Sequence, residues 1–176
     1  MSWNWMLFAA LFAWPWHAPP PVESGCRFSV SAAPAAPAIQ AGSITVPVRI
    51  LAQADSPAAI TALDLRQMVL VVGESGFQSY GTGPILIDVA NVSDRPLTRV
   101  DVVLQVRVNG GSTGVGGTIR MPIEPGGSGH LDLQIGRGAG TFNSKASAEV
   151  VAYIDAVEMS GCRYKPAQAW TLPTGK

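Results

Sequence analysis

Residues 85–108 read ILIDVANVSDRPLTRVDVVLQVRV, and this stretch decides the fold class. Apolar side chains recur at every second position in residues 85–89 and again in residues 100–108, with the turn-forming residues NVSDRP between the two runs. The alternate positions of the second run are mostly charged or polar, as in Arg99 and Asp101. A period of two is typical of strands with one face in the core and one in water. The stretch therefore predicts two strands of an antiparallel sandwich, separated by a turn.

Strand patterns continue on both sides of this stretch. Residues 44–50 alternate in the same way, and Pro47 places that strand at a sheet edge because proline donates no backbone hydrogen bond. Residues 60–72 favour a strand over a helix, because their second half is apolar and mostly β-branched. In that strand one face would carry Leu63, Leu65, Val69 and Val71. Other strands are expected at residues 27–30, 119–123, 131–135 and 149–159, and the last of these, apolar at both parities, would be covered on both faces.

The segments between these strands are rich in glycine, alanine or proline. Residues 31–41 are expected to be an extended connection, and residues 73–83 and 110–117 are expected to be loops. About eight strands joined by short turn signals remain, which is the pattern of β-sandwiches. The sequence thus predicts an all-β protein, an immunoglobulin-like antiparallel β-sandwich of about seven to nine strands with an N-terminal apolar leader.

Composition bounds the organisation and the partners. The chain has 176 residues, which suits one domain with a tail rather than two domains. Lys and Arg together number 12, as do Asp and Glu, so the net charge is zero, and no basic run is present. Nucleic acid is therefore excluded as an expected partner, because its recognition needs a basic surface.

The N-terminus carries an apolar run, WMLFAALFAW, at residues 5–14. It is shorter than the roughly 20 residues of a spanning helix and fits the apolar region of an export signal. Residues 1–22 are therefore expected to be a signal-like or anchor segment, and residues 23–176 a single β-sandwich domain outside the cytoplasm, in the periplasm, on the cell surface or secreted. No Lys or Arg precedes the run and no small-residue cleavage site follows it. The alternative is an apolar helix that contacts the domain or a membrane surface through its tryptophans.

The two cysteines lie in nearly identical pentapeptides, SGCRF around Cys26 and SGCRY around Cys162. An even number of cysteines in an exported chain indicates a disulfide, and the first and last strands of a sandwich often lie side by side. We therefore expect Cys26 and Cys162 to be bonded. The alternatives are two buried free thiols, or a lipid-modified Cys26, which Glu23 disfavours.

The candidates for catalysis are few. His17 lies in the leader, which leaves His130 as the histidine of the domain, and a Ser-His-Asp arrangement would have to combine it with Ser128 or a distant serine and an aspartate such as Asp132. A solvated strand histidine is the preferred interpretation. We therefore predict no catalytic residue.

No metal or cofactor site is predicted either. Asp88, Asp94 and Asp101 fall near one turn and could bind calcium, but ordinary surface charge explains them better. Residues 110–117 lack the Gly-Lys-Ser/Thr of a phosphate loop. The sequence Asn91-Val92-Ser93 matches a glycosylation acceptor and also suits a turn.

Four segments resemble bacterial immunoglobulin-like domains of the FxLYD and CARDB kind: residues 89–93, 100–108, 123–128 and 150–159. In those families a strand that ends in an Asn-x-Ser turn leads into an alternating strand, and a Pro-Gly turn and an apolar strand follow. The resemblance covers about residues 83–170. It implies a secreted or surface-attached adhesion, scaffold or assembly module without catalytic residues.

Three functions follow from these observations. The first is a non-catalytic exported module that binds a protein partner, or self-assembles, through an exposed edge such as the Pro47 strand or residues 60–72. The second is an enzyme or an accessory domain of one, with His130 and Asp132 in acid–base work. The third is a structural subunit of an envelope assembly or filament, held by Trp3, Trp5, Trp14 and Trp16.

Overall fold

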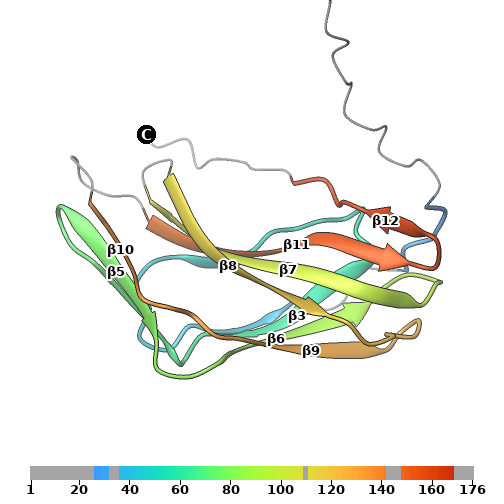
Figure 1. The fold of residues 1–176 in the computed structure, drawn as a ribbon, viewed down its shortest axis with the longest axis horizontal. Helices are drawn as coiled ribbons and strands as arrows, with labels where there is room; N and C mark the ends of the chain where they lie inside the picture. The colour runs from blue at the N-terminus through green and yellow to red at the C-terminus, as the bar shows by residue number, and fades with distance from the viewer. Residues whose placement is uncertain (1–25, 32–35, 109–110, 142–147, 169–176) are drawn as a thin grey trace, which may run out of the picture.

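The computed structural model describes residues 26–31, 36–108, 111–141 and 148–168 (Figure 1). All regular secondary structure in these residues is β, which confirms the prediction of an all-β protein. No helix in this part of the chain is long and apolar enough to cross a membrane. The predicted leader, residues 1–22, lies outside the described residues.

The described residues form twelve strands. In chain order they are β1 (Ala38–Gln40), β2 (Val48–Ile50), β3 (Ala58–Asp64), β4 (Met68–Val72), β5 (Gly76–Gly81), β6 (Ile85–Asn91), β7 (Leu97–Val108), β8 (Gly111–Ile119), β9 (Ser128–Leu133), β10 (Gly138–Thr141), β11 (Ala148–Met159) and β12 (Cys162–Tyr164).

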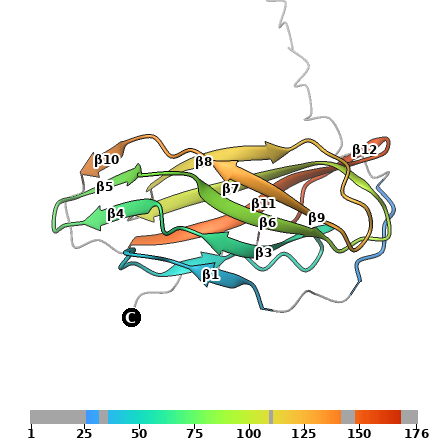
Figure 2. The same cartoon turned by 90° about the horizontal axis from the view of Figure 1, so that it is seen from below.

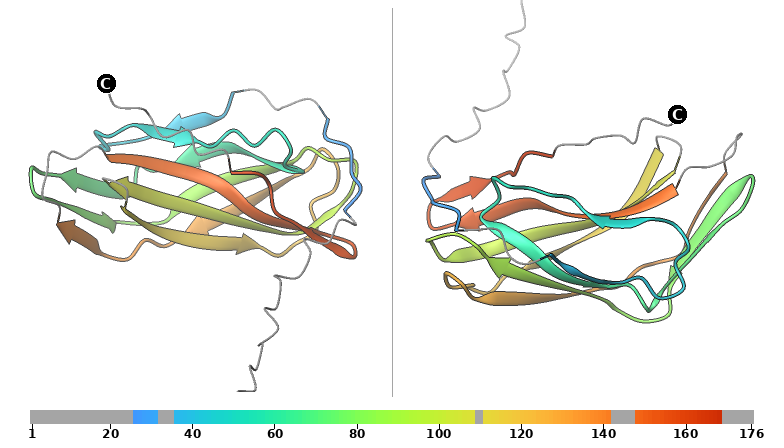
Figure 3. Two further views of the ribbon diagram at one scale, coloured as in Figure 1. Left: turned by 90° about the horizontal axis from the view of Figure 1, so that it is seen from above. Right: turned by 180° about the vertical axis from the view of Figure 1, so that it is seen from behind.

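Two of the three sheets form stacked layers, which we call the body (Figure 1). One layer has the order β1-β3-β6-β9, and Figure 2 shows these strands side by side. The other has the order β12-β11-β7-β8, with β2 parallel to β11, and is seen from above in Figure 3. The third sheet, β10-β5-β4, extends beyond one end of the body, and we call it the wing.

The core lies between the two layers of the body. In β6 the alternate residues Ile85, Ile87 and Val89 are fully buried, and in β7 Val100 and Val102 are buried in the same way. The alternation predicted for residues 85–108 is therefore confirmed, although the two strands lie in opposite layers. Burial of these side chains removes apolar surface from water and is the main force that holds the layers together.

Strand β11 is buried on both faces, as predicted. Its outward-facing Val151 and Tyr153 pack under Leu51. One edge of β11 pairs first with β2 and then with β12. Between these two strands, the side-chain amide of Gln53 accepts from the backbone N–H of Ile154 and donates to the backbone carbonyl of Ile154, and each of the two hydrogen bonds is 2.8 Å long. This edge of β11 is thus closed along its length.

The expectation of one strand over residues 60–72 is wrong. The backbone N–H of Met68 donates to the carbonyl of Leu65 at 2.9 Å and makes a turn that ends β3 and begins β4. The turn shifts the parity, so that Leu65 and Met68 are both buried and Val71 is 58% exposed. Strand β3 lies between β1 and β6 and is not an edge.

Several segments expected to be loops are strands. Residues 73–83 contain β5, residues 110–117 lie largely in β8, and residues 31–41 contain β1. Hydrogen bonds to a neighbouring strand hold these segments in place, so they need no apolar alternation of their own. Conversely, the expected strand at residues 27–30 reduces to the single bridge Val30–Ser93. Of the expected strand at residues 119–123, Ile119 ends β8 and Ile123 forms a single bridge with Leu97.

Candidate functional site

The described residues of the two matching pentapeptides, 26–28 and 160–164, lie together at one end of the body. Cys26 and Cys162 form a disulfide with their Cα atoms 5.6 Å apart, and two residues further along in each pentapeptide Phe28 meets Tyr164 edge to face at 5.0 Å. The Arg95 guanidinium donates to one backbone carbonyl in each pentapeptide. We call this arrangement the clasp. Its role is structural, because it ties the first described residues to the last strand.

Tyr164 anchors the clasp to the loop after β2. Its hydroxyl donates to the Asp55 carboxylate at 2.7 Å, and the backbone N–H of Ala167 donates to the same oxygen at 2.9 Å. Burial and the bond to Asp55 raise the pKa of Tyr164 to about 12. The phenol therefore stays protonated at physiological pH and acts as a hydrogen-bond donor.

His130 lies on the outer face of β9, between two carboxylates. Its Nδ1 is 2.5 Å from Asp88 Oδ1 and its Nε2 is 2.7 Å from Asp132 Oδ1. The hydrogen bond to Asp88 is the largest cause of a raised pKa at His130, and the charge of Asp132 adds to it. All three side chains are about half exposed. Both ring nitrogens face carboxylates, so a Ser128 hydroxyl finds neither nitrogen free to accept its proton.

The carboxylates proposed for calcium do not converge. Asp88 bonds His130 on one layer, whereas Asp94 accepts from the backbone N–H of Ser29. Asp101 lies on the other layer and accepts from Thr118 Oγ1 at 2.7 Å and from Arg99 Nε at 2.8 Å. Burial raises the pKa of Asp101, but these hydrogen bonds outweigh it and keep the pKa below its usual value. Each carboxylate thus has its own partner.

Asn91 has the turn role and not that of a glycan acceptor. The residue is 2% exposed. Its Nδ2 donates to the carbonyls of Arg95 and Ile123, both at 2.8 Å, and its Oδ1 accepts from the backbone N–H and the hydroxyl of Ser93. All of its amide atoms are used within the fold, so the side chain ties the end of β6 to the next turn and to residue 123.

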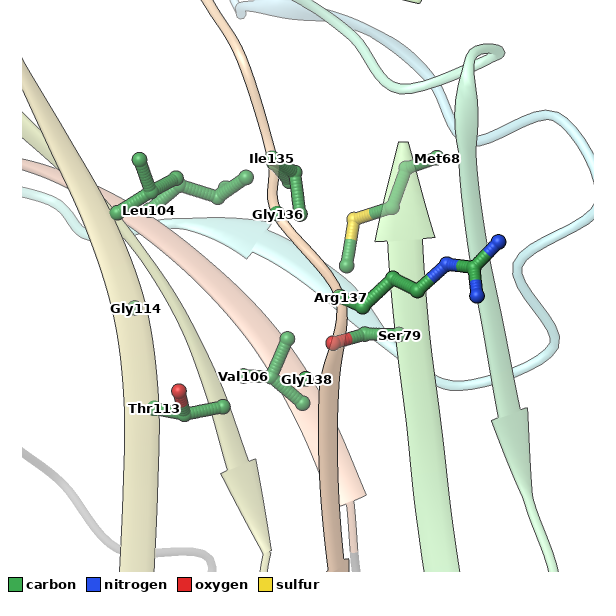
Figure 4. Close-up of a pocket in the computed structure, with 11 residues that line it drawn as sticks. Met68, Ser79, Leu104, Val106, Thr113, Gly114, Ile135, Gly136, Arg137 and Gly138 are labelled. Carbon is green, nitrogen blue, oxygen red and sulfur yellow. The ribbon is translucent and has the colours of Figure 1, made fainter. Parts of the chain in front are cut away.

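A cleft of about 230 Å³ lies between the wing and the body (Figure 4). Strand β8 bounds it on one side and the residues that lead into β10 bound it on the other. The lining residues are Met68, Ser79, Leu104, Val106, Thr113, Gly114, Val115, Ile135, Gly136, Arg137 and Gly138. A second hollow of about 180 Å³ shares Val106 and Thr113 with it and continues toward Phe77 and Thr141.

The lining of the cleft is almost free of charge. Arg137 is the charged residue among those that line the two hollows, and its side chain extends away from β8, over the β4–β5 hairpin (Figure 4). The apolar side chains Leu104 and Val106 form the floor on the side of the body. The cleft therefore suits uncharged, apolar groups.

Comparison of this chain with protein-family models, with curated proteins and with solved structures gives no significant match. The geometry of the cleft and of the polar clusters is therefore what bears on function. Of the candidate functional segments singled out from the sequence, the glycine-rich run that became β8 and residues 60–72, through Met68, contribute to the cleft. His130, the candidate aspartates and the two cysteines do not line it. The signal that could have found it is the density of glycine in residues 110–117 and 136–140, which leaves two facing strands with little side-chain cover.

Proposed function

We propose that this protein is an exported, non-catalytic module with an immunoglobulin-like sandwich, and that it binds a protein partner through an unpaired strand edge. The strand order supports the fold assignment. In the immunoglobulin plan one sheet holds strands A, B and E and the other holds C, F and G, with C′ beside C in the variable type. Strands β3, β6 and β9 correspond in order to A, B and E, and β12, β11, β7 and β8 correspond to G, F, C and C′.

The wing is an addition to this plan. Strands β4 and β5 are inserted between the strands that correspond to A and B, and β10 between those that correspond to E and F. The resemblance to the FxLYD and CARDB domains agrees with the body and does not account for the wing. An insertion that extends beyond a closed sandwich is a natural place for a binding surface.

Export is supported by the clasp. Disulfides persist in oxidising compartments, and the bond between Cys26 and Cys162 spans 136 residues of sequence. The apolar run of residues 5–14 agrees with an export signal or an anchor. These two observations together support the proposed extracytoplasmic location.

The observation that carries the proposed function is that the strand edges at the wing are unprotected. Natural proteins guard edge strands with charges, proline or short length. On the body, β2 follows Pro47 and carries Arg49, which pairs with Glu149 at 2.8 Å, and β9 carries the His130 cluster. The edge strands β4 and β10 of the wing contain no charged residue and no proline, although β10 has only four residues. On the body, β8 is an edge strand of nine residues that also lacks both. Such edges can accept a partner strand.

The sequence predicted two exposed strand edges, the Pro47 strand and residues 60–72. In the structure only a part of each segment is an edge strand. Residues 60–72 contribute an edge only through β4, because β3 is paired on both sides. Deletion of the whole segment would remove the buried residues Leu63, Leu65 and Met68 and would not leave the fold intact. Strand β2 is an edge of three residues.

The test places a lysine on each wing edge, in Val71→Lys and Ala139→Lys. Met121→Lys is the matched control, because Met121 is 59% exposed and Val71 is 58% exposed. Each full-length variant is immobilised and used to capture proteins from the envelope fraction of its source cells. A partner retained by the wild type and by Met121→Lys, and lost with a wing variant, supports the proposal. Equal capture by all four proteins contradicts it.

Self-assembly of copies is the second form of the same function. Light scattering of the full chain against the same wing variants separates it from capture of a different protein, because a subunit that assembles through the wing becomes monomeric with Val71→Lys or Ala139→Lys. A subunit held instead by residues 1–22 keeps its assembly in these variants and loses it when that segment is removed.

A further inference from the structure

Two unpaired strand edges flank the cleft between the wing and the body. Among the described residues β8 pairs only with β7, and β10 pairs only with β5. Their free edges present backbone N–H and C=O groups without a strand partner, and such groups favour hydrogen bonds to another main chain. A molecule that contacted only the apolar floor of the cleft would leave the backbone groups of both edges without hydrogen-bond partners.

The two edges run in opposite directions and separate along their length. A Cβ at Gly117 in β8 would overlap the Leu133 side chain of β9, and a Cβ at Gly129 in β9 would lie 3.2 Å from Ile119 Cγ2 of β8, so β8 and β9 touch where these glycines lie. Beyond Val115 and Ile135 the chains separate, and the two hollows lie between them.

The open part of β8 covers Gly111–Val115, which is about 17 Å of extended chain at 3.3 Å per residue. That length suits a short strand.

The walls define the chemistry of the occupant. Leu104, Val106 and Met68 present apolar side chains, and the Arg137 side chain points away from β8 (Figure 4). A charged side chain placed on this floor would lose its hydration without gaining a partner. The complementary segment is therefore uncharged, with apolar side chains at alternate positions facing the floor.

We infer that the cleft binds an extended, uncharged segment of a partner protein, which adds as a strand between β8 and β10. This inference rests on the proposed function and names its site and the kind of segment bound. Main-chain hydrogen bonds to the two edges supply affinity, and the apolar floor selects alternating apolar side chains.

The probe is a fluorescent, uncharged peptide of about seven residues that alternates valine and threonine, a length that matches the open part of β8. A second peptide has the same composition without alternation. A third has the alternating sequence with N-methyl groups on alternate residues, which remove backbone donors. Binding to the full chain is measured by fluorescence anisotropy. We expect the alternating peptide to bind at least about tenfold more tightly than either of the other two.

The cleft variant is Gly136→Leu. Gly136 lines the cleft, and a Cβ there would meet no protein atom within 4 Å, so the leucine fills the space of the occupant and leaves the fold intact. The matched control is Gly116→Leu on β8, where a Cβ would lie 3.4 Å from Val102 O and 3.6 Å from Val103 Cγ2, in ordinary contact on the outer face. We expect Gly136→Leu to weaken binding by about tenfold or more and Gly116→Leu to leave it unchanged. Circular dichroism checks that both variants are folded.

Several results would overturn the inference. Equal binding of the N-methylated peptide would exclude main-chain pairing, and unchanged binding to Gly136→Leu, or no binding by the wild type, would exclude the cleft. If the wild-type protein self-associates and Gly136→Leu abolishes this, the cleft binds a second copy of the chain and not a different protein. The two proposals fail separately. If Val71→Lys releases the captured envelope partner while Gly136→Leu keeps it, the proposed function stands, the module binds at the β4 edge, and only this inference is wrong. Equal capture by all variants contradicts the proposed function itself.

Discussion

The two ends of the molecule are built in opposite ways. At the clasped end the Cys26–Cys162 disulfide, the Phe28–Tyr164 contact and the buried amide of Asn91 tie the chain to itself. At the open end β10 and the first residues of β8 carry few large side chains, and the outer edges of the wing and of β8 have no strand partner among the described residues. Figure 1 shows β12, the strand that begins at Cys162, at one end and the wing at the other. The difference agrees with the proposal that one end secures the fold and the other end binds.

The two ends also differ in glycine content, because the strands beside the cleft are rich in glycine. Four of the nine residues of β8 and two of the four residues of β10 are glycine. Glycine in a strand interior costs stability, because the unfolded chain loses more freedom and no side chain packs. At Gly140 the Phe77 ring covers the position that a side chain would take. The open end thus gives up stability for a close approach of backbone, which strand addition requires.

The largest expected effect comes from removing the disulfide at the clasped end. Cys26→Ser combined with Cys162→Ser should lower the free energy of unfolding by about 3–5 kcal/mol, because the bond closes most of the domain into one loop. Urea denaturation followed by far-ultraviolet circular dichroism measures the loss. Peptide binding at the cleft should persist wherever the variant is folded. A loss below about 1 kcal/mol would show that the clasp does not secure the fold.

An intermediate effect is expected at Asn91. Asn91→Ala removes the amide and leaves the buried carbonyl of Ile123 without this donor, so the free energy of unfolding should fall by about 3 kcal/mol. Val71→Ala at the open end should change it by less than about 0.5 kcal/mol, because that side chain is mostly exposed. Both are read from urea denaturation midpoints. Similar losses in the two variants would contradict the contrast between the ends.

A smaller effect is expected at His130 on β9, and it depends on pH. Asp88 and Asp132 raise the pKa of His130 in the folded protein above its unfolded value of about 6.5. Their stabilisation is therefore complete below about pH 6.5 and is lost as the pH rises through the folded pKa. The stability difference between the wild type and His130→Ala should be larger at about pH 6 than at about pH 9. Ser128→Ala, on the same face of β9, is the control and should show no such pH dependence; the reverse trend for His130→Ala would exclude the ion pairs.

Side-chain patterns made strands β6, β7 and β11 of the body predictable, and their absence hid β1 and β8 of the body together with β5 and β10 of the wing. Strands β6, β7 and β11 place large apolar residues at regular positions, so a period of two or a continuous apolar run identifies each of them. Strands β5 and β10, with the sequences GFQSYG and GAGT, carry no such pattern. They are strands because Gly138 pairs with Ser79, a partner 59 residues away (138 minus 79), which no local pattern reveals.

The features of the candidate site were also predictable only where a local sequence pattern reveals them. The repeated pentapeptides pointed to the bond between Cys26 and Cys162, because identical local sequences are visible without a structure. The cleft depends on where β8 and β9 separate, and that is set by the tight contact at Gly117. The sequence shows such a glycine only as a sign of a loop. The turn role of Asn91 was one of two interpretations until its partners Arg95 and Ile123 were seen.

Native-state hydrogen exchange of the full chain tests most directly whether one end is secured and the other open. Paired amides of β6 and of the half of β11 next to β12 should exchange only through global unfolding, with the free energy measured by urea. Amides of β4, β5 and β10 should exchange through local opening at a clearly lower free energy, and those on the free edges should exchange fastest. Wing amides protected as strongly as those beside the clasp would contradict the account.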